Sequence, residues 1–204
     1  MKSDLRTIYD RFAETYEKNR ALFDMSDVIA DFTARLTGRP GLLLDLGCGA
    51  GEPFPAYFIR EGWQVVGVDF SERMLALARQ YHPDIKTVFA DIRDVDFPES
   101  RFDSVTAIYC LFHIEHVRHA EIFRKIHRWL APGGKSLFTY ATKDYTGYDV
   151  FNGYKEFMGE QLFYSHTSPD DLFAILESIG FTVEDRHYRR IGGETFLWVT
   201  VAKP

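Results

Sequence analysis

The chain has 204 residues, of which 46% are hydrophobic and 26% are charged, and its formal net charge at neutral pH is −6. This length and composition are typical of one globular domain of ordinary soluble type. The acidic balance argues against an extended nucleic-acid surface, because such surfaces neutralise phosphates with clustered lysine and arginine.

Residues 1–39 are predicted to form a helical cap ahead of the first strand. Leu5, Ile8 and Phe12 recur at helical spacing, and a second periodic set spans residues 28–36. Apolar residues three and four positions apart share one face of a helix. We therefore expect two helices in this segment.

From residue 41 onward, apolar strands alternate with helical segments. The run LLLDL at 42–46 is almost entirely apolar, as expected for a strand that is buried on both faces. Alternation of this kind predicts a parallel sheet with helices on both faces and right-handed crossovers. The expected parallel strands cover residues 41–46, 64–69, 85–90, 103–110 and 135–140.

The C-terminal part follows a different pattern. Ser168 and Pro169 begin a helix, as a serine N-cap followed by proline in the first turn, and Gly180 ends it. Two strands are expected after this helix, over residues 181–188 and 195–202. A hairpin at this position adds an antiparallel strand to the parallel sheet.

Glycine and acidic residues gather where the first two strands end. Gly47, Gly49 and Gly51 follow the first strand, and the second strand ends in Asp69. Glycines leave backbone amides open to a ligand, and an acid after the second strand is placed to accept hydrogen bonds from a ribose diol. Together these features predict a cofactor that contains a nucleoside.

The spacing of the glycine loop distinguishes between two such cofactors. A dinucleotide fold prefers G-x-G-x-x-G. This loop instead reads D-x-G-x-G-x-G and is followed by Glu52, an acid that would repel a pyrophosphate. The loop therefore suits a ligand with no phosphate and a positive centre. It resembles motif I of the class I S-adenosylmethionine-dependent methyltransferases.

The resemblance runs along the whole chain through four segments in the order typical of that family. They are LLLDLGCGAG (42–51), VVGVDFS (65–71), FADIRDVDFP (89–98) and LAPGGKSLFTY (130–140). The C-terminal hairpin belongs to the same fold and is absent from nicotinamide-binding domains. The resemblance implies an α/β fold in one domain over residues 1–204. Its Rossmann-like, seven-stranded, mostly parallel sheet would have helices on both faces and a C-terminal antiparallel hairpin.

The same resemblance implies S-adenosyl-L-methionine as cofactor and gives roles to several residues. Asp69 would bind the ribose hydroxyls, and Asp91 would hold the adenine amino group with the amide of Ile92 beside it. The other members of the expected cofactor site are Asp45, Gly47 and Gly49, which would face the methionine part, together with Cys48, Phe70, Met74 and Tyr109.

Each of these assignments has a structural alternative. A tight turn without a ligand explains the glycine loop, and helix capping explains Asp69. Asp91 has Asp94 and Asp96 close by, so it also fits a solvated acidic loop.

The N-terminal segment YDRFAETYEKNR (9–20) resembles a helix that folds over the cofactor in many small-molecule methyltransferases. On that resemblance, Tyr16 would reach the methionine carboxylate and Arg20 would pair with it. Plain helix packing is the alternative. A chain that starts near Arg20 and still binds the cofactor normally would favour the alternative.

Two histidines are candidates for catalysis or acceptor binding. His113 follows the fourth strand, close to the expected acceptor, and His166 immediately precedes the last helix. A base is needed only when the acceptor is a weak nucleophile. The alternative is that both imidazoles are structural hydrogen-bonding groups. No convincing metal-ligand spacing is present, so no metal is expected.

Residues 141–167 form an unusually aromatic insertion between the fifth strand and the last helix. These side chains would line an acceptor pocket, contact a sulfonium by cation–π attraction, or form the buried side of a lid helix. Insertions outside a shared scaffold carry function, so we expect substrate specificity to reside here.

The cysteine content and the hydropathy pattern bear on the compartment. Cys48 and Cys110 cannot build a disulfide framework, and free thiols are typical of a reducing compartment. No apolar run begins the sequence, and no apolar stretch is long enough to cross a membrane. We therefore expect a cytoplasmic protein without a membrane partner.

The function predicted from these residues is methyl transfer from S-adenosylmethionine to a small-molecule acceptor. The acidic balance and the lack of an added domain argue against nucleic-acid and large protein acceptors. The alternatives are a methyltransferase acting on RNA or protein, a nicotinamide dehydrogenase, which the loop spacing opposes, and a protein that binds the cofactor without catalysis. The acceptor, the attacking atom and the oligomeric state stay open.

Overall fold

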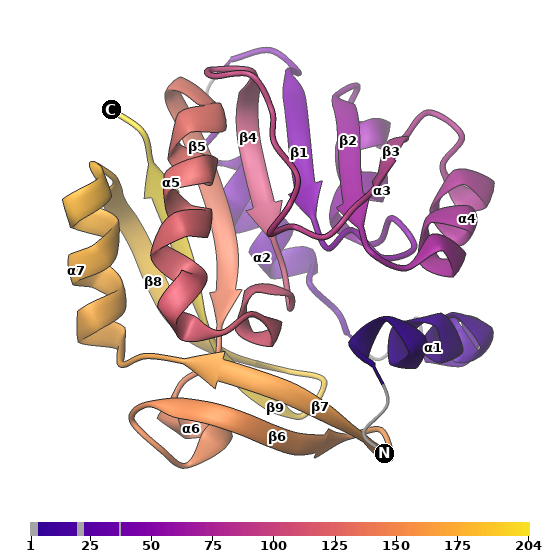
Figure 1. The fold of residues 1–204 in the computed structure, drawn as a ribbon. Coiled ribbons are helices and arrows are strands. Elements are labelled where there is room, and N and C mark those ends of the chain that lie inside the picture. The colour runs from indigo at the N-terminus through magenta and orange to yellow at the C-terminus, as the bar shows by residue number, and fades with distance from the viewer. Residues whose placement is uncertain (1–3, 20–22, 37) are drawn as a thin grey trace.

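A computed structural model of the chain describes residues 4–19, 23–36 and 38–204. The strands of its main sheet are β1 (Leu42–Leu46), β2 (Gln64–Asp69), β3 (Lys86–Phe89), β4 (Phe102–Ala107), β5 (Leu130–Tyr140), β8 (Thr182–Ile191) and β9 (Glu194–Ala202). They lie in the order β3-β2-β1-β4-β5-β9-β8 (Figure 1).

The first five strands of this sheet are parallel, and β9 runs antiparallel between β5 and β8. In the centre, Leu44 of β1 lies opposite Val66 of β2 and Val105 of β4. The predicted Rossmann-like sheet with a C-terminal antiparallel hairpin is therefore confirmed. Within the described ranges, no helix is both long enough and apolar enough to span a membrane.

Successive strand residues point into two separate cores on the two faces of the sheet. Leu43 packs in one core with Phe32 and Phe58, whereas Leu44 packs in the other with Phe123. The first core involves α2 (Ser26–Thr33), α3 (Phe54–Arg60) and α4 (Glu72–Tyr81), and the second involves α5 (His119–Trp129) and α7 (Pro169–Ile179), which cover the near face in Figure 1. Burial on both faces explains the nearly continuous apolar runs of the strands.

The carboxyl ends of the parallel strands share one edge, and two further units lie beyond it (Figure 1). One is α1 (Leu5–Asn19), and the other is the hairpin of β6 (Phe151–Phe157) and β7 (Glu160–His166), which follows the short helix α6 (Lys143–Thr146). The Ser71 hydroxyl donates to the Asp10 carboxylate at 2.6 Å, and Arg11 pairs with Glu160 at 2.6 Å. These contacts tie α1 to both the sheet edge and the hairpin.

The β6–β7 hairpin differs from the lid helix that is one expectation for residues 141–167. Met158 and Gly159 both have positive φ values, of 51° and 81°, and Phe157 pairs with Glu160 across them. Two-residue turns of this type match the twist of antiparallel strands. The Met-Gly turn therefore produces a hairpin in a segment whose aromatic content alone does not distinguish a helix from strands.

Strand β4 ends at Ala107, before the end expected at residue 110. Tyr109 has a left-handed φ of 54°, and its amide donates to the Thr139 hydroxyl at 2.6 Å. A strand does not continue through a left-handed residue, and the short turn η1 (Leu111–His113) follows instead. The chain therefore turns at the sheet edge, directly beside the end of β1. Strand β5 begins earlier than expected, because Leu130 pairs with Phe102 across a register shift.

Candidate active site

The glycine loop between β1 and α3 presents bare backbone at the sheet edge. Gly47 and Gly49 have φ values of 70° and 51°, in the region that favours glycine. A Cβ on Gly47 would lie 2.6 Å from the Cβ of Cys110, whereas a Cβ on Gly49 would project into open space. Gly47 is therefore required by packing, and Gly49 leaves the crevice open.

Two adjoining cavities occupy this crevice. The residues that line both are Tyr9, Gly47, Asp69, Tyr109 and His113. The small cavity has a volume of about 570 Å³, and the other, which we call the aromatic cavity, has about 1250 Å³; both volumes include space open to solvent. The two spaces therefore meet at one carboxylate, one histidine and two tyrosines.

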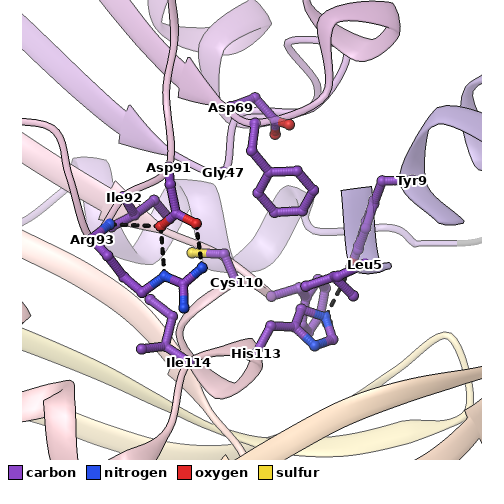
Figure 2. A pocket seen from close by; sticks show the side chains of 12 residues that line it. Leu5, Tyr9, Gly47, Asp69, Asp91, Ile92, Arg93, Cys110, His113 and Ile114 are labelled. Atoms are coloured by element: carbon purple, nitrogen blue, oxygen red, sulfur yellow. Dashed lines mark hydrogen bonds and ion pairs between the residues drawn. The ribbon is translucent and has the colours of Figure 1, made fainter. Parts of the chain in front are cut away.

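The small cavity is lined mainly by the residues that follow β2, β3 and β4. Figure 2 views it with Asp91 and Arg93 on one side and Tyr9 and His113 on the other. Phe70, Ile92, Cys110 and Ile114 also line it.

The aromatic cavity takes its walls from α1, from the turn after β4, from β7 and from β9. Its aromatic side chains are Tyr9, Phe12, Phe23, Tyr109, Phe112, Phe157, Tyr164 and Phe196. Of the aromatic residues in the insertion, Phe157 and Tyr164 line this cavity. Tyr148 and Tyr154 are exposed, and Tyr140 is fully buried in the core.

Most residues predicted to bind the cofactor lie together in this crevice. Those lining one or both cavities are Gly47, Cys48, Gly49, Asp69, Phe70, Met74, Asp91, Ile92 and Tyr109. Asp45 lines neither cavity. The side chain of Tyr16 and the whole of Arg20 lie outside the described part of the chain, so their predicted roles stay predictions.

Asp69 ends β2 at the junction of the two cavities. Its carboxylate accepts hydrogen bonds from the amides of Gly49 at 2.9 Å and Ser71 at 2.8 Å. Burial raises the pKa of Asp69 to about 6, although these two amides favour the ionised form. Two amide bonds leave lone pairs free on the carboxylate oxygens, which offer about four acceptor sites. The group thus both holds the glycine loop and faces the crevice.

Helix capping, the alternative for Asp69, belongs instead to Ser71, whose hydroxyl accepts from the amide of Met74.

Asp91 is half-buried beside the small cavity and forms a two-pronged ion pair. Arg93 donates from Nε at 2.9 Å and from Nη2 at 2.6 Å to the two carboxylate oxygens. Burial alone would raise the pKa of Asp91, but the hydrogen bonds from Arg93 outweigh it and hold the pKa below its usual range. Asp91 is therefore a fixed anion at the cavity wall.

His113 and Tyr9 form a hydrogen-bonded pair that lines both cavities. His113 Nδ1 lies 2.7 Å from the carbonyl oxygen of Phe163, so this nitrogen carries the proton and donates. Nε2 is then the acceptor for the Tyr9 hydroxyl at 2.9 Å. Burial lowers the pKa of His113 to about 4, which keeps the imidazole neutral at neutral pH.

His166 lines neither cavity, unlike His113, and its role beside an acceptor stays a prediction. Its side chain is fully buried, and Nε2 lies 2.8 Å from the Thr146 hydroxyl. Nδ1 lies 3.0 Å from the carbonyl oxygen of Thr167. With both nitrogens bonded inside the protein, His166 anchors α6 to the end of β7. These two contacts are of the kind expected from the structural alternative.

Comparisons with known proteins agree on one family. Residues 43–134 match the family model described as a methyltransferase domain. The chain is 30% identical over 148 residues to the 2-phytyl-1,4-naphtoquinone methyltransferase of Nostoc sp., a match that covers 67% of this chain and 64% of the relative. It is 27% identical over 159 residues to the demethylmenaquinone methyltransferase of Symbiobacterium thermophilum, covering 72% and 62% of the two chains. The chain thus spans less than two thirds of the length of these curated relatives.

Solved structures share the fold. The 1,6-didemethyltoxoflavin-N1-methyltransferase of Burkholderia thailandensis superposes with a TM-score of 0.71 at 24% identity, over 96% of this chain and 87% of that one. An S-adenosylmethionine-dependent methyltransferase of Mesorhizobium loti gives a TM-score of 0.71 at 22% identity, over 87% and 97%. Residues 43–134 therefore match a methyltransferase domain, and the chain has the class I methyltransferase fold.

The lining residues that were not among the predicted site residues include Tyr9, Arg93 and Glu194. Tyr9 comes from α1, Arg93 follows Asp91, and Glu194 begins β9. Arg93 had a local signal, because it stands two positions after a predicted acid. Tyr9 begins the segment that resembles a helix folding over the cofactor, but no local signal predicts its bond with His113. Glu194 had no local signal. Among the described residues, no group of three or more His, Cys, Asp or Glu side chains is arranged to hold a metal ion.

Asp45 lies behind the glycine loop and gives the class I domain a specific pH dependence. The Thr106 hydroxyl donates to its carboxylate. Burial nevertheless raises the pKa of Asp45 to about 7. In the unfolded chain the pKa of Asp45 lies near the ordinary value for an aspartate. At a pH between that value and about 7, only the folded state holds the proton on Asp45. The charged form therefore destabilises the fold increasingly as pH rises through this window.

Replacing Asp45 by asparagine removes this penalty. Relative to wild type, the free energy of unfolding of Asp45→Asn is expected to rise by about 1.4 kcal/mol per pH unit between pH 5 and about 7, and to level off above. Urea unfolding at several pH values measures the difference. Asp94→Asn, on an exposed loop residue, controls for the change in net charge. A difference between Asp45→Asn and wild type that does not change with pH contradicts the assignment.

Proposed function

We propose that this chain transfers the methyl group of S-adenosylmethionine to a small molecule bound in the aromatic cavity. The observation that carries the proposal is the meeting of the two cavities at Asp69, Tyr9 and His113. One space has the donors and acceptors that suit a nucleoside, and the other has the walls that suit an apolar ring. The family and the fold support the same activity.

The residues of the crevice fit the proposed cofactor. Asp69 has lone pairs left for a ribose diol, and Phe70 and Ile92 offer apolar contact for an adenine ring in the small cavity. An adenine amino group would share the Asp91 carboxylate with Arg93. The open space at Gly49 leaves room for the amino-acid part against bare backbone. These roles follow the family pattern at the matching positions.

When bound, S-adenosylmethionine supplies an electrophilic methyl group. Positioning by the cavity walls provides most of the acceleration of such a transfer. The acceptor becomes strongly acidic as it gains positive charge, so even a weak base suffices to remove its proton. The Tyr9 oxygen would accept this proton while the Tyr9 hydroxyl proton passes to Nε2 of His113, 2.9 Å away. The Phe163 carbonyl holds the imidazole in the required tautomer.

A small acceptor is favoured by the aromatic walls of the cavity and by the named substrates of relatives. One relative is a 27-O-demethylrifamycin SV methyltransferase, and others are named for quinones. The net charge of −6 supports the absence of a nucleic-acid partner. The free thiols of Cys48 and Cys110 support a reducing compartment and hence a cytoplasmic location.

Two successive measurements test this proposal. Calorimetry with S-adenosylhomocysteine asks whether the crevice binds the cofactor skeleton. Release of labelled methyl groups is then followed over a panel of phenols, hydroquinones and aromatic amines, with tRNA and a protein mixture as alternative acceptors. We expect binding and transfer to a small molecule. Labelling of RNA or protein alone contradicts the substrate class, and binding without transfer to any acceptor would favour the non-catalytic alternative.

A further inference from the structure

A carboxylate stands in the wall of the otherwise aromatic cavity. Glu194 is the first residue of β9 and lines this space together with Tyr164 and Phe196. It is only partly exposed, and the neighbouring Tyr145 side chain favours its charged form. Burial raises the pKa of Glu194, which means that its charged form lacks full solvation inside the cavity. A cation placed beside it would restore that lost stabilisation.

Aromatic rings line the same cavity as this carboxylate. Tyr145 lies 4.6 Å from Phe196 and 5.1 Å from Tyr164, measured between ring centres. Phe196 in turn lies 5.2 Å from Tyr109, which lines both cavities. Ring faces attract cations, most strongly where water is displaced. The wall around Glu194 therefore combines a charged hydrogen-bond acceptor with several electron-rich surfaces.

The charges facing the aromatic cavity are uniformly negative in the described part of the chain. Asp69, Glu52 and Glu194 line it, and no described lysine or arginine does. Lys155 is a cation whose charge lowers the pKa of Glu194. Its ammonium is engaged elsewhere, donating to the Tyr145 carbonyl and lying 4.4 Å from the centre of the Tyr145 ring. An anionic acceptor would meet repulsion in this space.

We infer that the acceptor of this enzyme is an aromatic molecule carrying a protonated amine, which Glu194 binds by a charge-assisted hydrogen bond. The inference rests on the proposed function, since it takes the aromatic cavity as the acceptor site. Hydrogen bonds between an ammonium and a carboxylate are about twice as strong as neutral ones. This chemistry differs from that of the quinones for which relatives are named, because a quinone brings no positive charge to Glu194.

The test uses matched probes on protein saturated with S-adenosylhomocysteine. Tryptamine, its neutral counterpart tryptophol and the acid indole-3-acetate are titrated by calorimetry. We expect tryptamine to bind at least about tenfold more tightly than tryptophol, and the acid to bind least. Glu194→Gln keeps the shape and an acceptor for Tyr145, and should remove the preference for the amine. Glu177→Gln removes the same charge from an exposed residue of α7 and should leave the preference unchanged.

The outcomes separate this inference from the proposed function. Failure to bind S-adenosylhomocysteine overturns the cofactor site itself. If that ligand binds but tryptamine gains nothing over tryptophol, or does not bind, the inference about Glu194 is overturned while the cofactor site stands. If Glu194→Gln still binds tryptamine more tightly than tryptophol, the inference about Glu194 is overturned as well. Circular dichroism of each variant establishes that the fold is intact before the affinities are compared.

Discussion

Replacing Asp69 by alanine is expected to weaken the binding of S-adenosylhomocysteine by roughly ten- to a hundredfold. The side chain lines both cavities, and its oxygens keep acceptor sites that the amides of Gly49 and Ser71 do not fill. Loss of a charge-assisted hydrogen bond to a ribose hydroxyl costs about 1.5–3 kcal/mol. Calorimetric titration measures the effect. Asp94→Ala makes the same change on an exposed residue that lines neither cavity and should bind as the wild type does.

Asp69 also holds the glycine loop, so a loss of affinity has two possible origins. Combining the Asp69→Ala variant with the removal of the ribose hydroxyls from the ligand separates the two origins. Adenosine should bind the wild type more tightly than 2′,3′-dideoxyadenosine does, and Asp69→Ala should bind both equally. Direct contact with the diol predicts this coupling between the two changes. If the ribose hydroxyls contribute as much in the variant as in the wild type, Asp69 acts through the loop alone.

Replacing His113 by alanine is expected to lower kcat by about a hundredfold, with little change in affinity for S-adenosylhomocysteine. The imidazole is neutral, because burial lowers its pKa to about 4, and its Nε2 is the acceptor for the Tyr9 hydroxyl at 2.9 Å. Removing it leaves that hydroxyl without an acceptor at the junction of the cavities. Transfer to an acceptor found in the panel is followed at saturating cofactor, and circular dichroism confirms the fold.

Two further variants decide how His113 acts. Tyr9→Phe keeps the ring in the cavity wall and removes only the hydroxyl, so a shared proton path predicts a loss similar to that of His113→Ala. His187→Ala removes an exposed imidazole from β8 and should be without effect. If Tyr9→Phe turns over like the wild type while His113→Ala does not, Tyr9 is not part of the path. A His113→Ala variant with unchanged kcat returns this histidine to a structural role.

The parallel half of the fold could be predicted because its signals are local. The runs that became β1 and β2 are apolar and end in glycine or acid, and the helix after Ser71 has its cap in place. The β6–β7 hairpin lacked such a signal in its aromatic content. Its Met158-Gly159 turn was visible in the sequence, but a single glycine after methionine is weak evidence unless the positive φ of both residues is known.

The candidate site also contains some residues that could be predicted from the sequence and others that could not. Gly47, Gly49 and Asp69 could be predicted, because the carboxyl ends of neighbouring parallel strands meet at one edge. The bond between Tyr9 and His113 joins residues 104 positions apart, and no spacing rule connects them. His166 looked similar to His113 in sequence, yet it is buried with two internal partners and lines neither cavity. Which titratable side chain reaches a site is decided by tertiary packing, which periodicity does not encode.

A crystal structure of the chain with S-adenosylhomocysteine tests the central claim most directly. We expect adenine in the small cavity beside Asp91 and Ile92, both ribose hydroxyls within hydrogen-bond distance of Asp69, and the homocysteine part along Gly47–Gly49 with its sulfur facing the aromatic cavity. A ligand bound elsewhere, or a crevice that stays empty at saturating ligand while Asp69 contacts only its two backbone amides, would contradict it.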